Sequence, residues 1–284
     1  WPTTLHIVKK KKINAILINL RMSPTSFNRW KKIPFFYNEI ISCFSEIFAQ
    51  SKMDQTRVQL LTKKKIKFVG NLKLLTTNDV LLENNSPNLI KNENTIILMI
   101  ASTHPGEEEI LLPIIKDLMV EFNHLRVIIA PRHPERAKEI ISLCSSFNLL
   151  SHLELPISDD TQSVNIIDTF GILERYFSVS DIVFLGGSLV AAGGHNPIEP
   201  AKHKCVILTG SIIFNWQNIF DDMIEEKACL KINSVEDLEN SLKNLLNNDE
   251  KIKNMKMNAF KYSQKQFVDT ITLDKIINNY LEIC

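Results

Sequence analysis

The stretch DIVFLGGSLVAAGGHNPIEPA, residues 181–201, joins a short apolar run to a glycine-rich segment and then to the start of a helix. It holds four of the chain's eight glycines. Glycine adopts backbone torsions that other residues avoid and lets a ligand approach the main chain, while Asn196 followed by Pro197 is typical of a helix start. The stretch therefore predicts a strand, a loop and a helix of an α/β sheet, with the loop at the edge where such sheets bind ligands.

Short apolar runs followed by amphipathic stretches recur along the chain, as expected of βα units around a parallel sheet. An asparagine-rich segment, residues 76–94, interrupts this alternation and is the expected linker. We therefore predict a first domain over 1–75 with about three strands, and a second over 95–284 with some five strands and terminal helices. The predicted strands are Ile13–Asn19, Glu46–Ala49, Lys67–Val69, Thr95–Ile100, Arg126–Ala130, Val164–Ile167, Ile182–Leu185 and Cys205–Leu208.

The composition is that of a globular protein, because 284 residues with 44% hydrophobic content can fill two cores. The 33 basic and 32 acidic residues leave a net charge of +1, so no global attraction to nucleic acid is expected. The five cysteines are scattered and include no C-x-x-C, which predicts neither disulfides nor a zinc site and fits a reducing compartment. No apolar run reaches 18 residues, and the first residues do not have the composition of a signal peptide.

Two other predicted strands also end in polar motifs. His104 lies in STHPGEEE, whose glutamates suit the positive end of a helix dipole; a well-capped surface helix is the alternative interpretation. Arg132 and Arg136 lie in PRHPER, where they would form a phosphate cradle or, alternatively, a solvated basic helix start. In the opening stretch, Glu199 would accept hydrogen bonds from ribose-like hydroxyls, unless the segment is only a turn and a capped helix. Together the three strand ends predict one nucleotide-sized crevice.

Several other functions are disfavoured. No G-x-G-x-x-G follows the first strand of either domain, and no G-x-x-x-x-G-K-[ST] phosphate loop is present, so a hydride-transfer enzyme or an ATPase is poorly supported. His104 and His195 have no carboxylate or cysteine partner at metal-ligand spacing, so no metal site is expected.

The motifs in order resemble those of the Kdo transferases, which add 3-deoxy-D-manno-octulosonic acid (Kdo) from CMP-Kdo to lipid A precursor. The resemblance covers essentially the whole chain, and its last three motifs are the most specific. The matching segments are RMS (21–23), AQS (49–51), GNLK (70–73), STHPGEEE (102–109), PRHPER (131–136) and GGSLVAAGGHNPIEP (186–200).

The resemblance implies a two-domain glycosyltransferase of the GT-B type, acting at the cytoplasmic face of the inner membrane. The amino-terminal domain would hold the lipid acceptor and the carboxy-terminal domain the CMP-sugar. No cofactor or metal is implied, since a phosphate-stabilising arginine and a carboxylate base suffice for the transfer. The residues implied to bind CMP are Pro131, Arg132, Phe170, Gly171, Ile172, Asn196, Pro197, Ile198 and Glu199.

A second set of residues is expected to contact the acceptor or the Kdo carboxylate. Arg21, Ser23 and Lys73 would do so from the first domain, although a buried ion pair is an equally good interpretation of these residues. The lysine runs 9–12 and 63–67 would face an anionic membrane or, as the alternative, solvent. The expected contacts in the second domain are His104, Gly187, Ser188 and His195.

The sequence departs from the family pattern at its beginning. In the family the catalytic base and a second important glutamate precede a Trp-Pro pair, and this chain begins with Trp1 and Pro2. We therefore expect no catalytic base within the 284 residues, and an amino-terminal domain that lacks its beginning. We predict that these residues alone bind CMP but do not transfer sugar, and that a separately encoded amino-terminal fragment could restore transfer by docking. The alternatives are an inactive remnant that binds nucleotide and another GT-B sugar-nucleotide enzyme.

Overall fold

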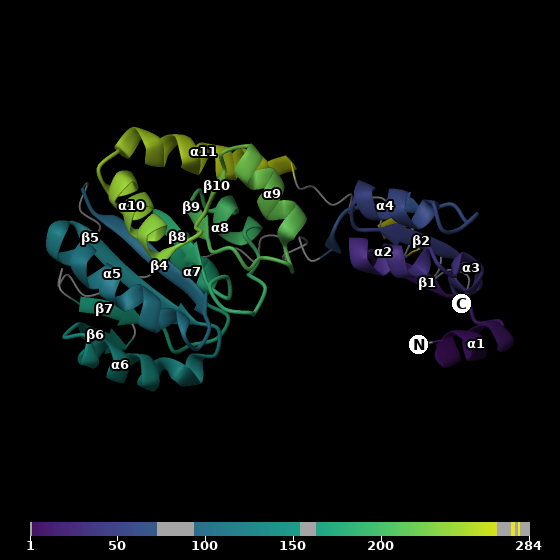
Figure 1. Ribbon diagram of the computed structural model, residues 1–284, viewed down its shortest axis with the longest axis horizontal. Helices are drawn as coiled ribbons and strands as arrows, with labels where there is room; N and C mark the ends of the chain where they lie inside the picture. The colour runs from purple at the N-terminus through teal and green to yellow at the C-terminus, as the bar shows by residue number, and fades with distance from the viewer. Residues whose placement is uncertain (1, 73–93, 154–162, 266–273, 276–277, 279–284) are drawn as a thin grey trace. The chain divides into compact units, whose positions relative to one another are not determined.

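The computed structural model describes residues 2–72, 94–153, 163–265, 274–275 and 278. By contacts between residues the chain divides into two compact units (Figure 1). Unit 2 spans residues 79–265, and unit 1 comprises the remainder. The predicted linker lies outside the described residues except for Asn94, so it stays a prediction. Residues 266–284, which the sequence assigns to the second domain, lie outside the described residues except for 274, 275 and 278, so that assignment stays a prediction.

Unit 1 is built on a small parallel sheet of order β1-β2-β3, in which β2 pairs with both neighbours. Ile47 on β2 and Val58 on α4 are fully buried in its core. Ser23 and Ser51 start two helices by accepting the backbone N–H three residues on. The elements are α1 Pro2–Lys10, β1 Ile16–Leu20, α2 Pro24–Trp30, α3 Pro34–Ser42, β2 Glu46–Ala49, α4 Lys52–Gln59 and β3 Lys67–Phe68.

Unit 2 contains a seven-stranded parallel sheet of order β10-β9-β8-β4-β5-β7-β6, with helices packed around it (Figure 1). Its central strand β4 is buried almost throughout, as expected of a parallel strand covered on both faces. The strands are β4 Ile96–Thr103, β5 Leu125–Pro131, β6 Leu150–Leu153, β7 Ser163–Ile166, β8 Ile182–Leu185, β9 Val206–Thr209 and β10 Cys229–Lys231. The helices are α5 Glu107–Glu121, the 3₁₀ turn η2 Pro134–Arg136, α6 Ala137–Ser146, α7 Leu173–Phe177, α8 Ile198–Lys202, α9 Gln217–Glu225, α10 Val235–Leu246 and α11 Asp249–Lys265.

All eight predicted strands are present, with ends displaced by at most three residues, and the predicted α/β class is confirmed. The sequence misses β6 and β10, the two strands at the edges of the larger sheet. Both are short, and β6 carries exposed or half-buried side chains at all four positions. An edge strand that buries so little lacks the apolar run on which the prediction depends.

The strand order determines where a ligand can bind. From the central strand β4 the chain first moves to β5 on one side and later reaches β8 on the other. Ligands of open α/β sheets bind at such a switch point, outside the carboxyl ends of the strands. The ends of β8, β4 and β5 are therefore neighbours, so the three polar motifs begin at one sheet edge. The nucleotide-sized crevice between them stays a prediction.

Candidate functional site

Main-chain hydrogen bonds hold the three strand ends together. The N–H of Arg132, after β5, donates to the carbonyl of Thr103 at 3.0 Å, and the N–H of Gly186, after β8, donates to that of Ala101 at 2.8 Å. A Cβ atom on Gly186 would lie 2.7 Å from the carbonyl oxygen of Ser102, which is backbone and cannot turn away. Glycine is thus required where the β8 loop crosses the end of β4.

A narrow pocket of about 40 Å³ lies between the loops that follow β5 and β7. Pro131, Arg132, Phe170 and Gly171 line it, and Ile172 comes next in the chain, where α7 begins. The Arg132 guanidinium carbon lies 5.9 Å from the centre of the Phe170 ring, which is 66% exposed. The site thus offers a cation beside a flat aromatic ring that is exposed to solvent.

His104 and His195 meet at the same sheet edge, with their Nε2 atoms 3.0 Å apart and their rings stacked. Burial, and then the charges of His104 and Arg132, lower the pKa of His195 to about 4. Burial also lowers the pKa of His104, although the Glu107 carboxylate opposes this. Both rings are therefore neutral at pH 7. In the contact between them, the Nε2–H of one ring donates a hydrogen bond to the bare Nε2 of the other. Gly187 lies against the pair: a Cβ there would be 3.0 Å from Nε2 of His195.

The segment from Asn196 to Glu199 forms a closed hydrogen-bonded turn. The Asn196 side chain accepts from the N–H of Ile198 at 3.0 Å and donates to Glu199 Oε1 at 2.9 Å. Helix α8 begins at Ile198, with Pro197 at the cap, one residue later than the sequence predicts. Burial raises the pKa of Glu199, while the hydrogen bond from Asn196 acts against this. One carboxylate oxygen is thereby fixed at the helix start.

The three glutamates of STHPGEEE lie in the first turn of α5, as predicted, but Glu107 and Glu108 are fully buried, so the alternative of a surface helix is wrong for them. Glu107 Oε2 accepts the N–H of His104 at 2.9 Å and that of Gly187 at 2.6 Å. Its Oε1 accepts those of Ser188 at 3.0 Å and Leu189 at 2.9 Å. The sequence holds only part of the signal, a glycine-rich loop whose successive amides need an acceptor, because Glu107 lies 80 residues before that loop.

The predicted two-arginine phosphate cradle is wrong for Arg136. Its guanidinium donates twice to Glu108, at 2.8 and 3.1 Å, and also to Glu139 at 3.1 Å. These carboxylates raise the pKa of Arg136, although burial acts in the opposite direction. Because Glu108 neutralises Arg136, Arg132 provides the cationic group on this side of the pocket.

The remaining predicted contacts differ in accessibility. Ser188 is fully buried, and its hydroxyl donates to the carbonyl of Leu185 at 2.6 Å and accepts from the N–H of Gly210 at 2.8 Å. In unit 1, Ser23 caps α2, and Arg21 is exposed in the preceding loop. Lys73 lies outside the described residues. The assignment of Arg21, Ser23 and Lys73 to the acceptor stays a prediction.

Two further structural observations concern metal ions and the membrane. Within residues 2–72, 94–153 and 163–265, and the few others described, no three His, Cys, Asp or Glu side chains are grouped so that they could hold a metal ion. Over the same parts of the chain, no helix combines the length and apolar character that crossing a bilayer requires.

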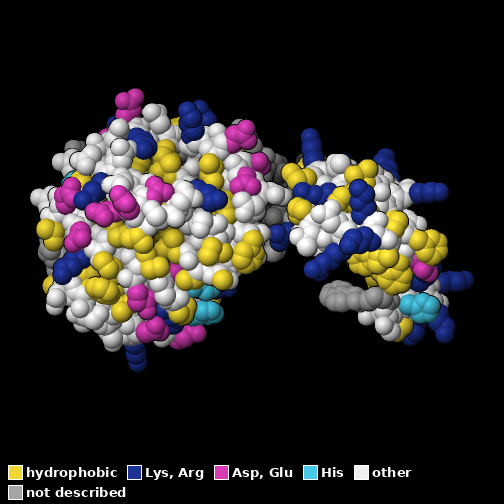
Figure 2. Space-filling view, viewed as in Figure 1, with side chains coloured by type: hydrophobic (Ala, Val, Ile, Leu, Met, Phe, Trp, Pro, Cys, Tyr) yellow, Lys and Arg dark blue, Asp and Glu magenta, His cyan; other side chains and the backbone are white. Residues whose placement is uncertain are grey.

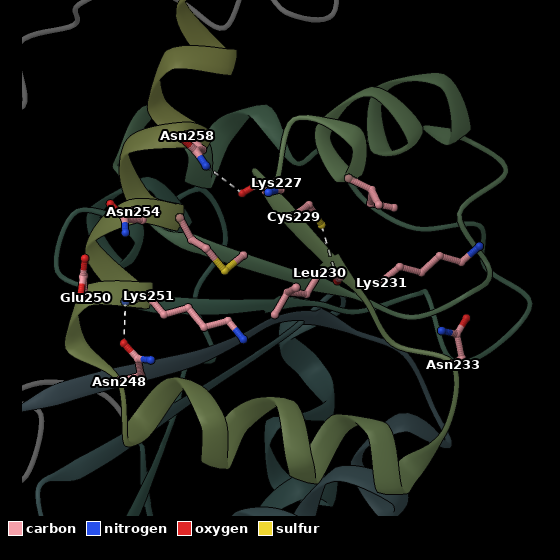
Figure 3. Close-up of a pocket in the computed structure, with 12 residues that line it drawn as sticks. Lys227, Cys229, Leu230, Lys231, Asn233, Asn248, Glu250, Lys251, Asn254 and Asn258 are labelled. Carbon is pink, nitrogen blue, oxygen red and sulfur yellow. Dashed lines mark hydrogen bonds between the residues drawn. The ribbon is translucent and has the colours of Figure 1, made fainter.

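A separate cavity of about 770 Å³ lies between the edge strand β10 and α11 (Figure 3). Cys229, Leu230 and Met255 supply its apolar part, and lysine and asparagine side chains surround it. Lys251 extends across it from α11, and its Nζ donates to Asn244 Oδ1 at 2.6 Å. None of the residues predicted to bind the donor lines this cavity.

The whole chain is 35% identical to the 3-deoxy-D-manno-octulosonic acid transferase of Rickettsia bellii and covers 67% of that protein. This chain belongs to the 3-deoxy-D-manno-octulosonic acid transferase family. A family model described as "3-Deoxy-D-manno-octulosonic-acid transferase (kdotransferase)" matches residues 1–76. The Haemophilus influenzae transferase is 34% identical over 88% of the chain. The chain spans about 60 to 67% of the length of these Kdo transferases.

Solved structures agree with the family assignment. The C-terminal CMP-Kdo binding domain of WaaA from Acinetobacter baumannii is 31% identical, with a TM-score of 0.56, over 61% of this chain and 91% of that domain. A glycosyltransferase from Rickettsia africae matches 99% of the chain and 79% of its own, with a TM-score of 0.53 and 16% identity. The second likeness shows the fold alone, and the GT-B type predicted for this Kdo-transferase family member is confirmed.

Proposed function

We propose that the protein transfers Kdo from CMP-Kdo to a lipid A precursor, and that unit 2 binds the CMP-Kdo. The observation that supports this best is that Arg132 and Phe170 line one pocket at the carboxyl edge of the unit 2 sheet. The Asn196–Glu199 turn follows His195, which meets His104 at the same edge. Family membership supports the reaction, and the relative from Acinetobacter, described as a CMP-Kdo binding domain, supports the donor.

Each part of the site has chemistry suited to part of the donor. Pro131 and the segment Phe170–Ile172 would contact the flat cytosine, because they provide apolar surface and main-chain groups. Arg132 would hold the phosphate and stabilise the charge that develops there when the glycosidic bond breaks. Glu199 would accept hydrogen bonds from ribose hydroxyls, and Pro197 and Ile198 shape the turn that presents it. His104, Gly187 and His195 would contact the Kdo or phosphate portion.

Unit 1 carries the net positive charge expected of a domain that binds an anionic acceptor. Its residues 2–72 include 14 Lys and Arg and 3 Asp and Glu, a net +11 within a chain of net +1. Figure 2 shows these basic side chains over much of its surface, beside apolar ones near α3. Phe35 on α3 is 83% exposed. We propose that this unit faces the lipid acceptor and the inner membrane, with contributions from Arg21, Ser23, Lys73 and the lysine runs 9–12 and 63–67.

Calorimetric titration with CMP, UMP and ADP tests the donor assignment. We expect CMP to bind at least about tenfold more tightly than the other two, and Arg132→Ala to lose at least about tenfold of that affinity. Arg126→Ala, at the amino end of the same strand, is the matched control and should bind CMP normally. Equal affinity for the three nucleotides, or no CMP binding by the folded chain, would contradict the donor assignment.

Sedimentation with liposomes tests the membrane assignment separately. We expect binding to vesicles that contain anionic lipid and release at high salt, since screening weakens attraction between charges. Phe35→Ser should reduce the bound fraction, while Phe214→Ser, an exposed phenylalanine of unit 2, should not. Equal binding to neutral and anionic vesicles would argue against an electrostatic contribution of the basic side chains to membrane binding.

A further inference from the structure

Glu107 contributes no charge to the surface, yet it makes four hydrogen bonds to main-chain amides at the sheet edge where the donor is proposed to bind. We propose that Glu107 is a positioning residue, which holds the loop 187–189 and His104 in the shape that receives the donor. The inference rests on the proposed CMP-Kdo site in unit 2. It concerns a residue that does not itself line the pocket.

The four bonds connect two segments distant in sequence. One oxygen bridges His104, after β4, and Gly187, after β8, while the other accepts Ser188 and Leu189. Successive amides that converge on one anion form a nest, which in many proteins holds a phosphate. Here the anion is the protein's own carboxylate. The loop amides therefore have a hydrogen-bond acceptor before any ligand arrives. Because the loop is already ordered, ligand binding does not have to supply the free energy of ordering it.

The loop in turn determines the spacing of the histidine pair. Gly187 has φ +65°, and a Cβ at this position would lie 3.0 Å from Nε2 of His195 and 3.2 Å from Cδ2 of His104. The backbone at Gly187 thus packs against both rings, while Glu107 also fixes the backbone of His104. A shift of the loop would change the 3.0 Å contact between the two rings. Glu107 acts on the site through these contacts.

Glu108 and Glu109, the two neighbouring glutamates, serve as controls, because each carries the same carboxylate but makes different contacts. Glu108 is as buried as Glu107, but it pairs with Arg136. Glu109 is exposed in the same helical turn. Three consecutive glutamates thus provide a positioning carboxylate, a buried ion-pair carboxylate and a solvated carboxylate.

Glutamine variants at these three positions test the inference in the full chain. Glu107→Gln keeps the side-chain shape but directs an NH₂ group at backbone N–H donors, which repels them. We expect it to bind CMP at least about tenfold more weakly at pH 7. Glu109→Gln should bind within about twofold of the original chain, and Glu108→Gln should lose stability while the folded protein retains its affinity. Affinity in Glu107→Gln equal to that of the original chain would overturn the proposal.

A second readout does not depend on nucleotide. Imidazole ¹⁵N NMR of the free protein should show one fixed tautomer for His104 and His195, and this signature should be lost in Glu107→Gln but kept in Glu109→Gln. If the original chain fails to bind CMP, the donor assignment fails, and the NMR comparison still decides the role of Glu107. If Glu107→Gln does not fold, Glu107→Asp retains the charge but is too short to reach four amides. An Asp variant with normal affinity and an unchanged histidine signature would also overturn the proposal.

Discussion

In each unit a buried carboxylate from the first turn of a helix holds the loop that follows another strand, but the two loops are held differently. In unit 2, both oxygens of Glu107 accept only main-chain N–H groups, four in all. In unit 1, Asp54 accepts the N–H of Met22 at 2.7 Å, and its other oxygen accepts the Ser51 hydroxyl at 2.6 Å. Arg57 donates to the carbonyl of Met22 at 3.0 Å.

This difference predicts how strongly the conformation of each loop depends on its carboxylate. A hydroxyl can rotate toward another acceptor, and Arg57 would still hold the Met22 loop if Asp54 were removed. The four amides around Glu107 have fixed directions, and those of Gly187 and Ser188 are buried. The donor-side loop is therefore the one whose shape depends on a single side chain, and the stability of the two units should reveal this.

The largest effect is expected for Glu107→Ala. It leaves two buried and two half-buried N–H groups without their acceptor. Each buried group costs roughly 1 to 3 kcal/mol, so the free energy of unfolding of unit 2 should fall by about 4 kcal/mol. Hydrogen exchange read by mass spectrometry in increasing urea measures this, because peptides of the two units are resolved. Unit 1 peptides serve as the internal control. A loss below about 1 kcal/mol would mean that water replaces the carboxylate.

Arg136→Ala should rank second. It leaves the Glu108 carboxylate buried without its cation, which costs about 3 kcal/mol in comparable pairs. Glu139→Ala removes the exposed partner of the same arginine and should change the free energy by less than about 1 kcal/mol. Chemical denaturation of both variants provides the comparison. Equal losses in the two variants would show that burial of Glu108 does not determine the cost.

Asp54→Ala is the counterpart in unit 1 and should cost about 2 kcal/mol, because one buried amide loses its acceptor. The same exchange experiment measures the loss, now in unit 1 peptides. Asp54→Asn keeps an acceptor for the Met22 N–H and should therefore lose only about half as much free energy of unfolding as Asp54→Ala. A cost as large as that of Glu107→Ala would remove the difference between the two loops.

Acid should weaken unit 2 through His195. Its folded pKa of about 4 lies below the usual value near 6.5, so the unfolded state binds more protons between these values. The contribution is fully present above pH 6.5 and is lost as pH falls toward 4. We expect on the order of 1 kcal/mol, because the ring is partly solvated. His195→Gln should show a flatter pH dependence of unfolding over this window, and an identical slope would contradict the assignment.

The smallest effects are expected where buried hydroxyls have no partner within the described part of the chain. Tyr37 in unit 1 and Thr209 in unit 2 are such groups, and burial raises the pKa of Tyr37 to about 12. Tyr37→Phe and Thr209→Val remove an unsatisfied group at little change in shape. Each should leave stability unchanged or raise it by up to about 1 kcal/mol in thermal unfolding. A loss above 1 kcal/mol would indicate a partner.

The sequence predicts the parts of the site that depend on neighbours along the chain. The strand, glycine loop and helix of residues 181–201 follow from apolar spacing and from the torsions of glycine and proline, and the helix starts within one residue of its predicted position. The side-chain pairing of Asn196 with Glu199 is likewise local, as it spans three residues. By contrast, the edge strands β6 and β10 are only four and three residues long, and β6 has no buried side chain, so neither produces a clear apolar run.

By itself, the sequence determined the α/β class, the strand ends that carry polar motifs and the resemblance to one transferase family, because periodicity and short motifs are properties of adjacent residues. Only the tertiary structure decided which glutamate of the run 107–109 meets the loop of Gly187, and that Arg136 is neutralised. Consecutive helical residues point in directions about 100° apart. Which direction meets a loop 80 residues away depends on the order of strands β8, β4 and β5, and no local pattern encodes that order.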